Sequence, residues 1–129
     1  KIKRINLKDK KFIKNKIFCT ILLSGSKEIK HLNKKFRKKN KTTDVLSFPF
    51  YSKNELKKKL KKDKEIYLGD IIININKINK KDILNNFKIQ FDRLWIHGFV
   101  HLFGYDHKKK IDFLKMSNIE KKYFDLINA

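Results

Sequence analysis

The sequence predicts an α+β domain in which helices pack on a small mixed β-sheet. Short segments rich in β-branched residues alternate with longer segments whose apolar residues recur at helical spacing. Some of the short segments are separated by hairpin-like connections and others by longer crossovers, which indicates both antiparallel and parallel pairing. The 129 residues, 40% of them hydrophobic, are enough for one modest core, and no linker or internal repeat divides them. We therefore expect residues 1–129 to form a single domain.

Three segments are predicted strands. Residues 17–23 are apolar and β-branched, and a Ser-Gly-Ser turn sequence follows them. Residues 45–48 form the second candidate, which ends at the only proline of the chain. Residues 67–75 are the strongest candidate, because β-branched residues occur throughout the segment.

Helices are predicted between and after the strands. Residues 27–38 place apolar side chains at helical spacing, and residues 78–86 are expected to form a short helix. Residues 87–103 are apolar on more than one side of a helix, as expected for a largely buried central helix. A last helix over residues 110–127 carries one apolar face. The apolar residues of this last helix are Ile111, Leu114, Ile119, Phe124 and Ile127.

The chain is strongly basic. Its 34 Lys and Arg residues against 13 Asp and Glu residues give a formal net charge of +21, which favours polyanionic partners such as RNA. The alternative is compositional drift, since Lys, Ile and Asn are frequent throughout and the lysines are spread along the chain. Both interpretations stay open at this stage. The lysine-rich residues 53–65 are expected to form a solvated loop that includes at most a helical turn, and the alternative is a specific clamp for RNA.

Composition also bears on location. The apolar runs are far too short to cross a bilayer, and no apolar region with a cleavage site opens the chain. Cys19 is the only cysteine, which excludes an internal disulfide and fits a reducing compartment. We expect a cytoplasmic protein without a membrane partner, in which Cys19 is a small buried residue without a function.

The region around residue 100 contains three of the four histidines. His97 and His101 are four positions apart, so on a helix of about 3.6 residues per turn their rings leave the same face. A third ligand requires the chain to turn back, and Gly104 stands where a helix ends in a left-handed conformation. His107 follows this turn. Three such imidazoles bind zinc and leave one coordination position for water, although they would also accept nickel or ferrous iron.

This spacing matches the metal-ligand pattern H-E-x-x-H-x-x-G-x-x-H of the metzincin proteases, with one difference. The Glu that serves those proteases as general base is Gly98 in this chain. A single histidine on an apolar helix face is usually a core residue with one hydrogen bond. Three histidines at ligand spacing, with a turn glycine between them, favour a metal site instead. The fourth, His31, is expected to be exposed.

Two carboxylates have open roles. Asp106 lies beside His107. It either accepts a hydrogen bond from a metal-binding histidine and so orients that ring, or it caps the last helix. Asp70 is either a general base or a turn residue near the start of its strand.

The motif His-Gly-x-x-His-Leu-x-Gly-Tyr-Asp-His at residues 97–107 resembles the characteristic motif of the YbeY family, which are bacterial single-strand endoribonucleases and rRNA maturation factors. Further segments resemble the family in order and approximate spacing, and the resemblance extends from about Ile17 to the C-terminus. These segments are Leu-Asn at 32–33, Phe-Arg at 36–37, Thr-Asp-Val-Leu-Ser-Phe-Pro at 43–49, Leu-Gly-Asp-Ile at 68–71, Met116 and Glu120.

The resemblance implies a sheet with surrounding helices and one zinc ion on the three histidines. It implies single-stranded rRNA and ribosomal subunits as partners, with no DNA, and roles in 3′-end maturation of small-subunit rRNA and in ribosome quality control. It also points to Arg37, which aligns with the functional arginine of the family and whose planar guanidinium matches a phosphate. Without the resemblance, Arg37 would be assigned as a solvated surface charge.

Three functions remain to be compared. The leading hypothesis is a zinc-dependent endoribonuclease acting on single-stranded rRNA, in which either a zinc-activated water or the 2′-hydroxyl of the RNA attacks the phosphate. The second is a non-catalytic ribosome-assembly factor in which zinc is structural. The third is a metalloprotease, which Gly98 disfavours because the usual general base is missing.

Overall fold

The computed structural model describes residues 15–78, 84–105 and 110–128. These residues form three strands, four α-helices and one short 3₁₀ helix. In chain order the elements are β1 (Lys16–Ser24), α1 (Ser26–Arg37), β2 (Val45–Pro49), α2 (Lys53–Lys62), β3 (Glu65–Asn74), the 3₁₀ helix (Ile75–Lys77), α3 (Leu84–Leu102) and α4 (Lys110–Ile127).

The strands of the described residues form one mixed sheet in the order β1-β3-β2. β1 is parallel to β3, and the long connection that parallel pairing needs is supplied by α1, β2 and α2. β2 runs antiparallel to β3 along its other edge. The predicted α+β fold with a small mixed sheet is confirmed.

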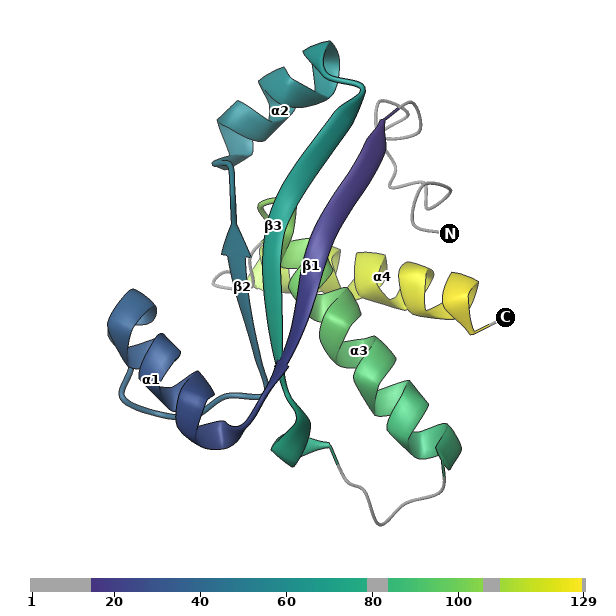
Figure 1. Ribbon diagram of the computed structural model, residues 1–129. Coiled ribbons are helices and arrows are strands. Elements are labelled where there is room, and N and C mark those ends of the chain that lie inside the picture. The colour runs from purple at the N-terminus through teal and green to yellow at the C-terminus, as the bar shows by residue number, and fades with distance from the viewer. Residues whose placement is uncertain (1–14, 79–83, 106–109, 129) are drawn as a thin grey trace.

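Different helices pack on the two faces of the sheet. In Figure 1, α3 and α4 lie behind the sheet, and α1 lies toward its lower left. Ile71 and Ile73 of β3 are completely buried in the main core, which includes Phe99 of α3. The residue between them, Ile72, points to the opposite face, where it packs with Ile29 of α1. We call this second face the outer face of the sheet.

A β-bulge interrupts β3. Ile66 and Leu68 belong to the main core, and so does Ile71, although an unbroken strand would place residues 68 and 71 on opposite faces. The register with β1 shifts at this point, and Gly69 has a φ of 140°. One extra residue exchanges the two faces of a strand, so Asp70 lies on the outer face.

α3 is the central, largely buried helix that the sequence predicts. It begins at Leu84, so the prediction of a separate short helix over residues 78–86 is wrong where the structure describes it: residues 84–86 belong to α3. Residues 79–83 lie outside the described residues. Within the described ranges, no helix is long and apolar enough to cross a membrane.

The predicted last helix is present, but it uses only part of its apolar face. Met116 and Tyr123 are buried, and Ile119 packs against the main core together with the apolar residues near the C-terminal end. Ile111 and Leu114 are exposed instead. α4 therefore contacts α3 mainly through its middle and C-terminal turns.

The prediction of a loop over residues 53–65 is wrong, because α2 occupies most of this segment. Ser52 and Glu55 form a capping box, in which each side chain accepts a hydrogen bond from the backbone N–H of the other at 3.2 Å. The hydrogen bonds with Ser52 lower the pKa of the Glu55 carboxyl. Leu56 and Leu60, one turn apart, are buried in the main core. The cap and two leucines at helical spacing are enough to form a helix among the lysines.

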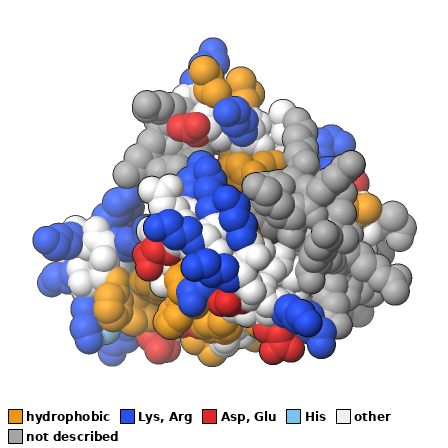
Figure 2. Space-filling model, turned by 90° about the horizontal axis from the view of Figure 1, so that it is seen from above, with side chains coloured by type: hydrophobic (Ala, Val, Ile, Leu, Met, Phe, Trp, Pro, Cys, Tyr) orange, Lys and Arg blue, Asp and Glu red, His pale blue; other side chains and the backbone are white. Residues whose placement is uncertain are grey.

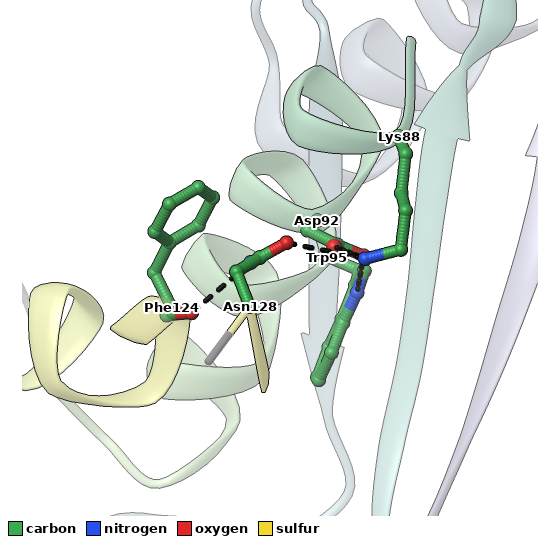
Figure 3. Close-up of polar contacts among 5 residues, drawn as sticks. All are labelled: Lys88, Asp92, Trp95, Phe124 and Asn128. Atoms are coloured by element: carbon green, nitrogen blue, oxygen red, sulfur yellow. Dashed lines mark hydrogen bonds and ion pairs between the residues drawn. The ribbon is translucent and has the colours of Figure 1, made fainter. Parts of the chain in front are cut away.

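A buried carboxylate connects α3 to the end of α4 (Figure 3). Asp92 accepts hydrogen bonds from Trp95 Nε1 at 3.0 Å and from Lys88 Nζ at 2.9 Å. Lys88 Nζ also donates to Asn128 Oδ1 at 3.1 Å, and Asn128 Nδ2 donates to the Phe124 carbonyl at 3.0 Å. Because Asp92 is buried, its charge depends on these donors.

Replacing Asp92 tests this connection. Asp92→Ala is expected to lower the free energy of unfolding by about 1–3 kcal/mol, because the buried indole N–H of Trp95 loses its acceptor. Urea denaturation measures the change. The matched control is Asp125→Ala, which removes an exposed carboxylate paired with Lys121 on α4 and is expected to change stability by less than about 0.5 kcal/mol. Equal effects of the two substitutions would contradict a structural role for Asp92.

Candidate active site

Two histidines face each other on α3. His97 and His101 lie one turn apart, and their Nε2 atoms are separated by 3.1 Å. The ring centroids are 4.6 Å apart, with the ring planes at 86°. The structure thus brings the two rings together, as their four-residue spacing predicts.

Each histidine ring has an oxygen atom close to its Nδ1 atom. His97 Nδ1 is 2.5 Å from Glu120 Oε1 on α4, and His101 Nδ1 is 2.8 Å from the carbonyl oxygen of Tyr105. An ionised carboxylate and a carbonyl only accept hydrogen bonds, so in a neutral ring Nδ1 carries the proton and Nε2 carries the lone pair. Two lone pairs at 3.1 Å repel each other unless a cation or a proton lies with them. The arrangement is therefore suited to a positive ion.

The pair fits two ligands of one zinc ion. Tetrahedral zinc binds nitrogen at about 2.0–2.1 Å, which places two ligand nitrogens about 3.3 Å apart. The third predicted ligand, His107, and its neighbour Asp106 lie outside the described residues. In the part of the chain that the structure describes, no group of three or more His, Cys, Asp or Glu residues is placed to hold a metal ion.

The chain leaves α3 at the predicted glycine. α3 ends at Leu102, and the backbone N–H of Gly104 donates to the His101 carbonyl at 2.9 Å. Gly104 has a φ of 92°, a conformation that glycine adopts at little cost. This turn brings the Tyr105 carbonyl back against the ring of His101.

Gly98 faces the sheet. Its carbonyl accepts a hydrogen bond from Ser47 Oγ on β2 at 2.9 Å. A Cβ atom at residue 98 would lie 2.7 Å from Ile71 Cγ2 and 2.9 Å from Ser47 Oγ, closer than side chains pack. The carboxylate of the metzincin pattern therefore has no room at this position.

The histidine pair lines a cleft of about 590 Å³. Arg37, Lys39 and Lys41, from the end of α1 and the connection to β2, line it as well. The other described lining residues are Asn33, Thr43, Asp44, Val45, Leu46, Ser47, Pro49, Gly104 and Tyr105. With three cationic side chains and one carboxylate among these residues, the cleft is suited to a polyanion.

Arg37 connects the cleft to β2. Its guanidinium donates a hydrogen bond to the Ser47 carbonyl and lies with its central carbon 5.8 Å from the centroid of the Phe48 ring. A guanidinium has five N–H donors, so this anchor leaves capacity for a phosphate. Arg37, His97 and His101 therefore line one cleft.

Asp70 is not brought to this cleft. It stands opposite Phe48 in the sheet register, and Phe48 packs with Ile72 on the outer face. Its carboxylate accepts a hydrogen bond from the Tyr67 hydroxyl, which raises the pKa of Tyr67. Burial, and to a smaller extent Asp70, raises the pKa of the Cys19 thiol, which agrees with an unreactive cysteine. The geometry gives Asp70 no role as a general base at the histidines.

Two carboxylates have site positions that sequence spacing does not indicate. Glu120 matches the family pattern, but only the packing of α4 on α3 brings it to His97, 23 positions away. Asp44 is at the start of β2, where its carbonyl accepts from the Asn74 backbone N–H at 2.9 Å. Asp44 also lines the cleft. Together with Glu120 and His97, it lines an adjoining cavity of about 450 Å³.

The fold and the site define a small α+β domain that presents a histidine pair to a basic cleft. The family model described as Endoribonuclease YbeY matches residues 2–128, so the chain belongs to the YbeY endoribonuclease family. The family resemblance of the sequence motifs is confirmed.

Two curated relatives agree with this assignment. The chain is 48% identical over 121 residues to the Endoribonuclease YbeY of Pelagibacter ubique (strain HTCC1062), covering 92% of this chain and 75% of that protein. It is 39% identical over 124 residues to the Endoribonuclease YbeY of Thermodesulfovibrio yellowstonii, covering 89% and 74%. A solution structure of a protein from Thermotoga maritima is 28% identical, with a TM-score of 0.46, and the match covers 87% of this chain and 71% of that one.

Gly98→Ala tests the close approach of α3 to the sheet. The added methyl group would collide with Ile71 and Ser47, so we expect the free energy of unfolding to fall by about 1–3 kcal/mol, as measured by urea denaturation. At an exposed helix position, alanine is instead expected to stabilise, as Asn118→Ala on α4 should show. Equal or greater stability of Gly98→Ala would show that the contact at residue 98 is not tight.

Proposed function

We propose that this chain is a zinc-dependent endoribonuclease in which His97, His101 and His107 hold the ion. The observation that carries the proposal is the 3.1 Å approach of two Nε2 atoms. Glu120 and the Tyr105 carbonyl support it, because zinc-bound histidines usually donate their other ring N–H to such an oxygen. Membership of the YbeY family supports RNA as the substrate.

The residues that line the cleft have separate roles in this proposal. A bound zinc ion would supply Lewis acidity for attack on a phosphodiester. Arg37 would hold the phosphate oxygens with its planar fork and offset the charge that develops on them. Lys39 and Lys41 would attract the RNA backbone into the cleft. Asp44, the one carboxylate among the described lining residues, would accept the proton of the attacking hydroxyl or water.

We further propose that the substrate is single-stranded rRNA of the small ribosomal subunit, cut during maturation of its 3′ end in the cytoplasm. The same activity would serve ribosome quality control, with ribosomal subunits as partners and neither membrane nor DNA involved. The net charge of +21 and the basic cleft support a polyanionic substrate of this kind.

The two other functions differ in their support. A metalloprotease would need its carboxylate at residue 98, where Ile71 and Ser47 leave no room. A ribosome-assembly factor with a structural zinc ion is compatible with the same histidines, so metal content and cleavage must be measured together.

Replacing the histidines tests the proposal. By mass spectrometry, the purified chain is expected to contain about one zinc ion, and His101→Ala and His107→Ala are expected to lose it. Each variant should cleave an unstructured rRNA fragment at least about 100-fold more slowly. The matched control is His31→Ala, an exposed residue of α1, which should retain zinc and activity.

Each other outcome has a defined meaning. Unchanged zinc content and cleavage in His101→Ala would contradict the proposal. Zinc loss without any cleavage by the unmodified chain, together with impaired rRNA maturation in cells, would favour the assembly factor. Chelator-sensitive cleavage of casein would favour the protease.

Arg37 is tested by two substitutions. Arg37→Ala is expected to lower kcat by about 100-fold, because one preorganised donor to the reacting phosphate is lost. Arg37→Lys should lose less, since it keeps the charge without the planar fork. Zinc content should be unchanged in both variants. Lys34→Ala removes a charge from the same helix outside the cleft and is the matched control. A loss in Arg37→Ala no larger than in Lys34→Ala would remove Arg37 from the mechanism.

A further inference from the structure

A row of aromatic side chains crosses the outer face of the sheet. We call it the aromatic row. Each of its five members comes from a different part of the fold: α1, β2, the residue after β2, β3 and β1. In spatial order the members are Phe36, Phe48, Phe50, Tyr67 and Phe18.

Direct contacts and strand pairing connect the row. The ring centroids of Phe36 and Phe48 are 5.5 Å apart, and those of Phe50 and Tyr67 are 6.0 Å apart. Phe48 and Phe50 are two positions apart, so their side chains leave the same side of the chain. Tyr67 and Phe18 are partners in the register of β3 and β1. Two ring contacts and the strand pairing therefore place the five side chains next to one another on the outer face.

Most of this row is open to solvent. The exposed fractions are 67% for Phe50, 57% for Phe36, 48% for Phe18 and 37% for Tyr67. Large apolar side chains that are exposed together on one face often mark a binding surface. The hydroxyl of Tyr67 is held by Asp70 and by Thr20 Oγ1, the latter at 2.7 Å. These hydrogen bonds hold the hydroxyl end of Tyr67 in place, although they do not set the rotation of the ring about its own axis.

Cations accompany the rings at the α1 end of the row. Lys35 Nζ lies 5.3 Å from the centroid of the Phe36 ring, and the guanidinium carbon of Arg37 lies 5.8 Å from that of Phe48. On the face seen from above in Figure 2, Lys and Arg side chains likewise lie next to hydrophobic ones. Aromatic rings interleaved with cations suit single-stranded nucleic acid, whose bases stack while its phosphates pair with Lys and Arg.

Arg37 also joins the row to the cleft. It lines the cleft that contains His97 and His101, and its guanidinium lies against Phe48 of the row. β2 is an edge strand of the described sheet, so a chain that leaves the cleft can pass over this edge onto the outer face. This continuity favours RNA over a protein partner or a second copy of the chain, because neither requires the row to adjoin the cleft.

We propose that the aromatic row binds unpaired nucleotides that flank the cleavage position by stacking with their bases. The inference rests on the proposed function for its substrate class, RNA, but it concerns binding and not cleavage. It assigns the row a contribution that depends on the bases, whereas the lysines of the cleft contribute through the phosphates.

The experiment compares two RNA probes of equal length and charge. One is a short unstructured oligoribonucleotide, and the other lacks its bases outside the central nucleotides. Affinity is measured by fluorescence anisotropy in the His101→Ala chain, so that the probe stays intact. Phe50→Ala is expected to weaken binding of the complete probe by about fivefold or more, because one stacked base is lost. It should leave binding of the base-depleted probe unchanged.

Matched substitutions separate stacking from general effects. Phe50→Tyr keeps an aromatic ring and should retain affinity, whereas Phe50→Leu should lose it. Phe113→Ala removes a ring of similar exposure, 53%, from α4 and should have no effect. If His101→Ala does not fold, the same comparison is made with the unmodified chain and single-stranded DNA of the same sequence.

Several results would overturn the inference. Equal loss of affinity for both probes in Phe50→Ala would show that bases are not recognised by the row, as would an equal effect of Phe113→Ala. Concentration-dependent self-association that Phe50→Ala abolishes, with RNA affinity unchanged, would identify the row as an interface between copies. The proposed function is judged separately, because zinc content and cleavage in the unmodified chain do not depend on this measurement.

Discussion

The close contact between α3 and the sheet at Gly98 is the constraint on which the site depends. Ser47 Oγ donates to the Gly98 carbonyl at 2.9 Å, and Ile71 fills the space that a side chain at residue 98 would need. Because α3 lies this close to β2, the adjacent His97 reaches the cleft beside the strand, and His101 follows one turn later. A tightly packed interface of this kind has little freedom to shift, so the histidine positions are set by the core.

The orientation of the two rings depends on other parts of the fold. Glu120 approaches His97 from α4, and the turn after α3 supplies the Tyr105 carbonyl to His101. α4 is in turn connected to α3 by the buried Asp92 and its donors, five positions before His97 on α3. Ring orientation is therefore coupled to helix packing outside the cleft, as is usual where supporting hydrogen bonds orient a ligand.

The cleft and the aromatic row are two surfaces that meet at Arg37. Arg37 ends α1, is anchored on the Ser47 carbonyl, and lies between the lysines of the cleft and the ring of Phe48. Phosphate binding on one side of β2 and base stacking on the other would let the protein hold a single strand through both of its chemical components. The position of β2 at the edge of the described sheet makes this arrangement possible.

Local periodicity by itself determined the approach of His97 and His101 and the turn at Gly104, because helical spacing and a left-handed glycine do not depend on what the helix packs against. Only the tertiary structure decided that Asp70 lies on the outer face, since a β-bulge exchanges the two faces of a strand and simple alternation does not reveal it. It also decided that Glu120 reaches His97, because a contact between residues 23 positions apart on two helices depends on how those helices pack.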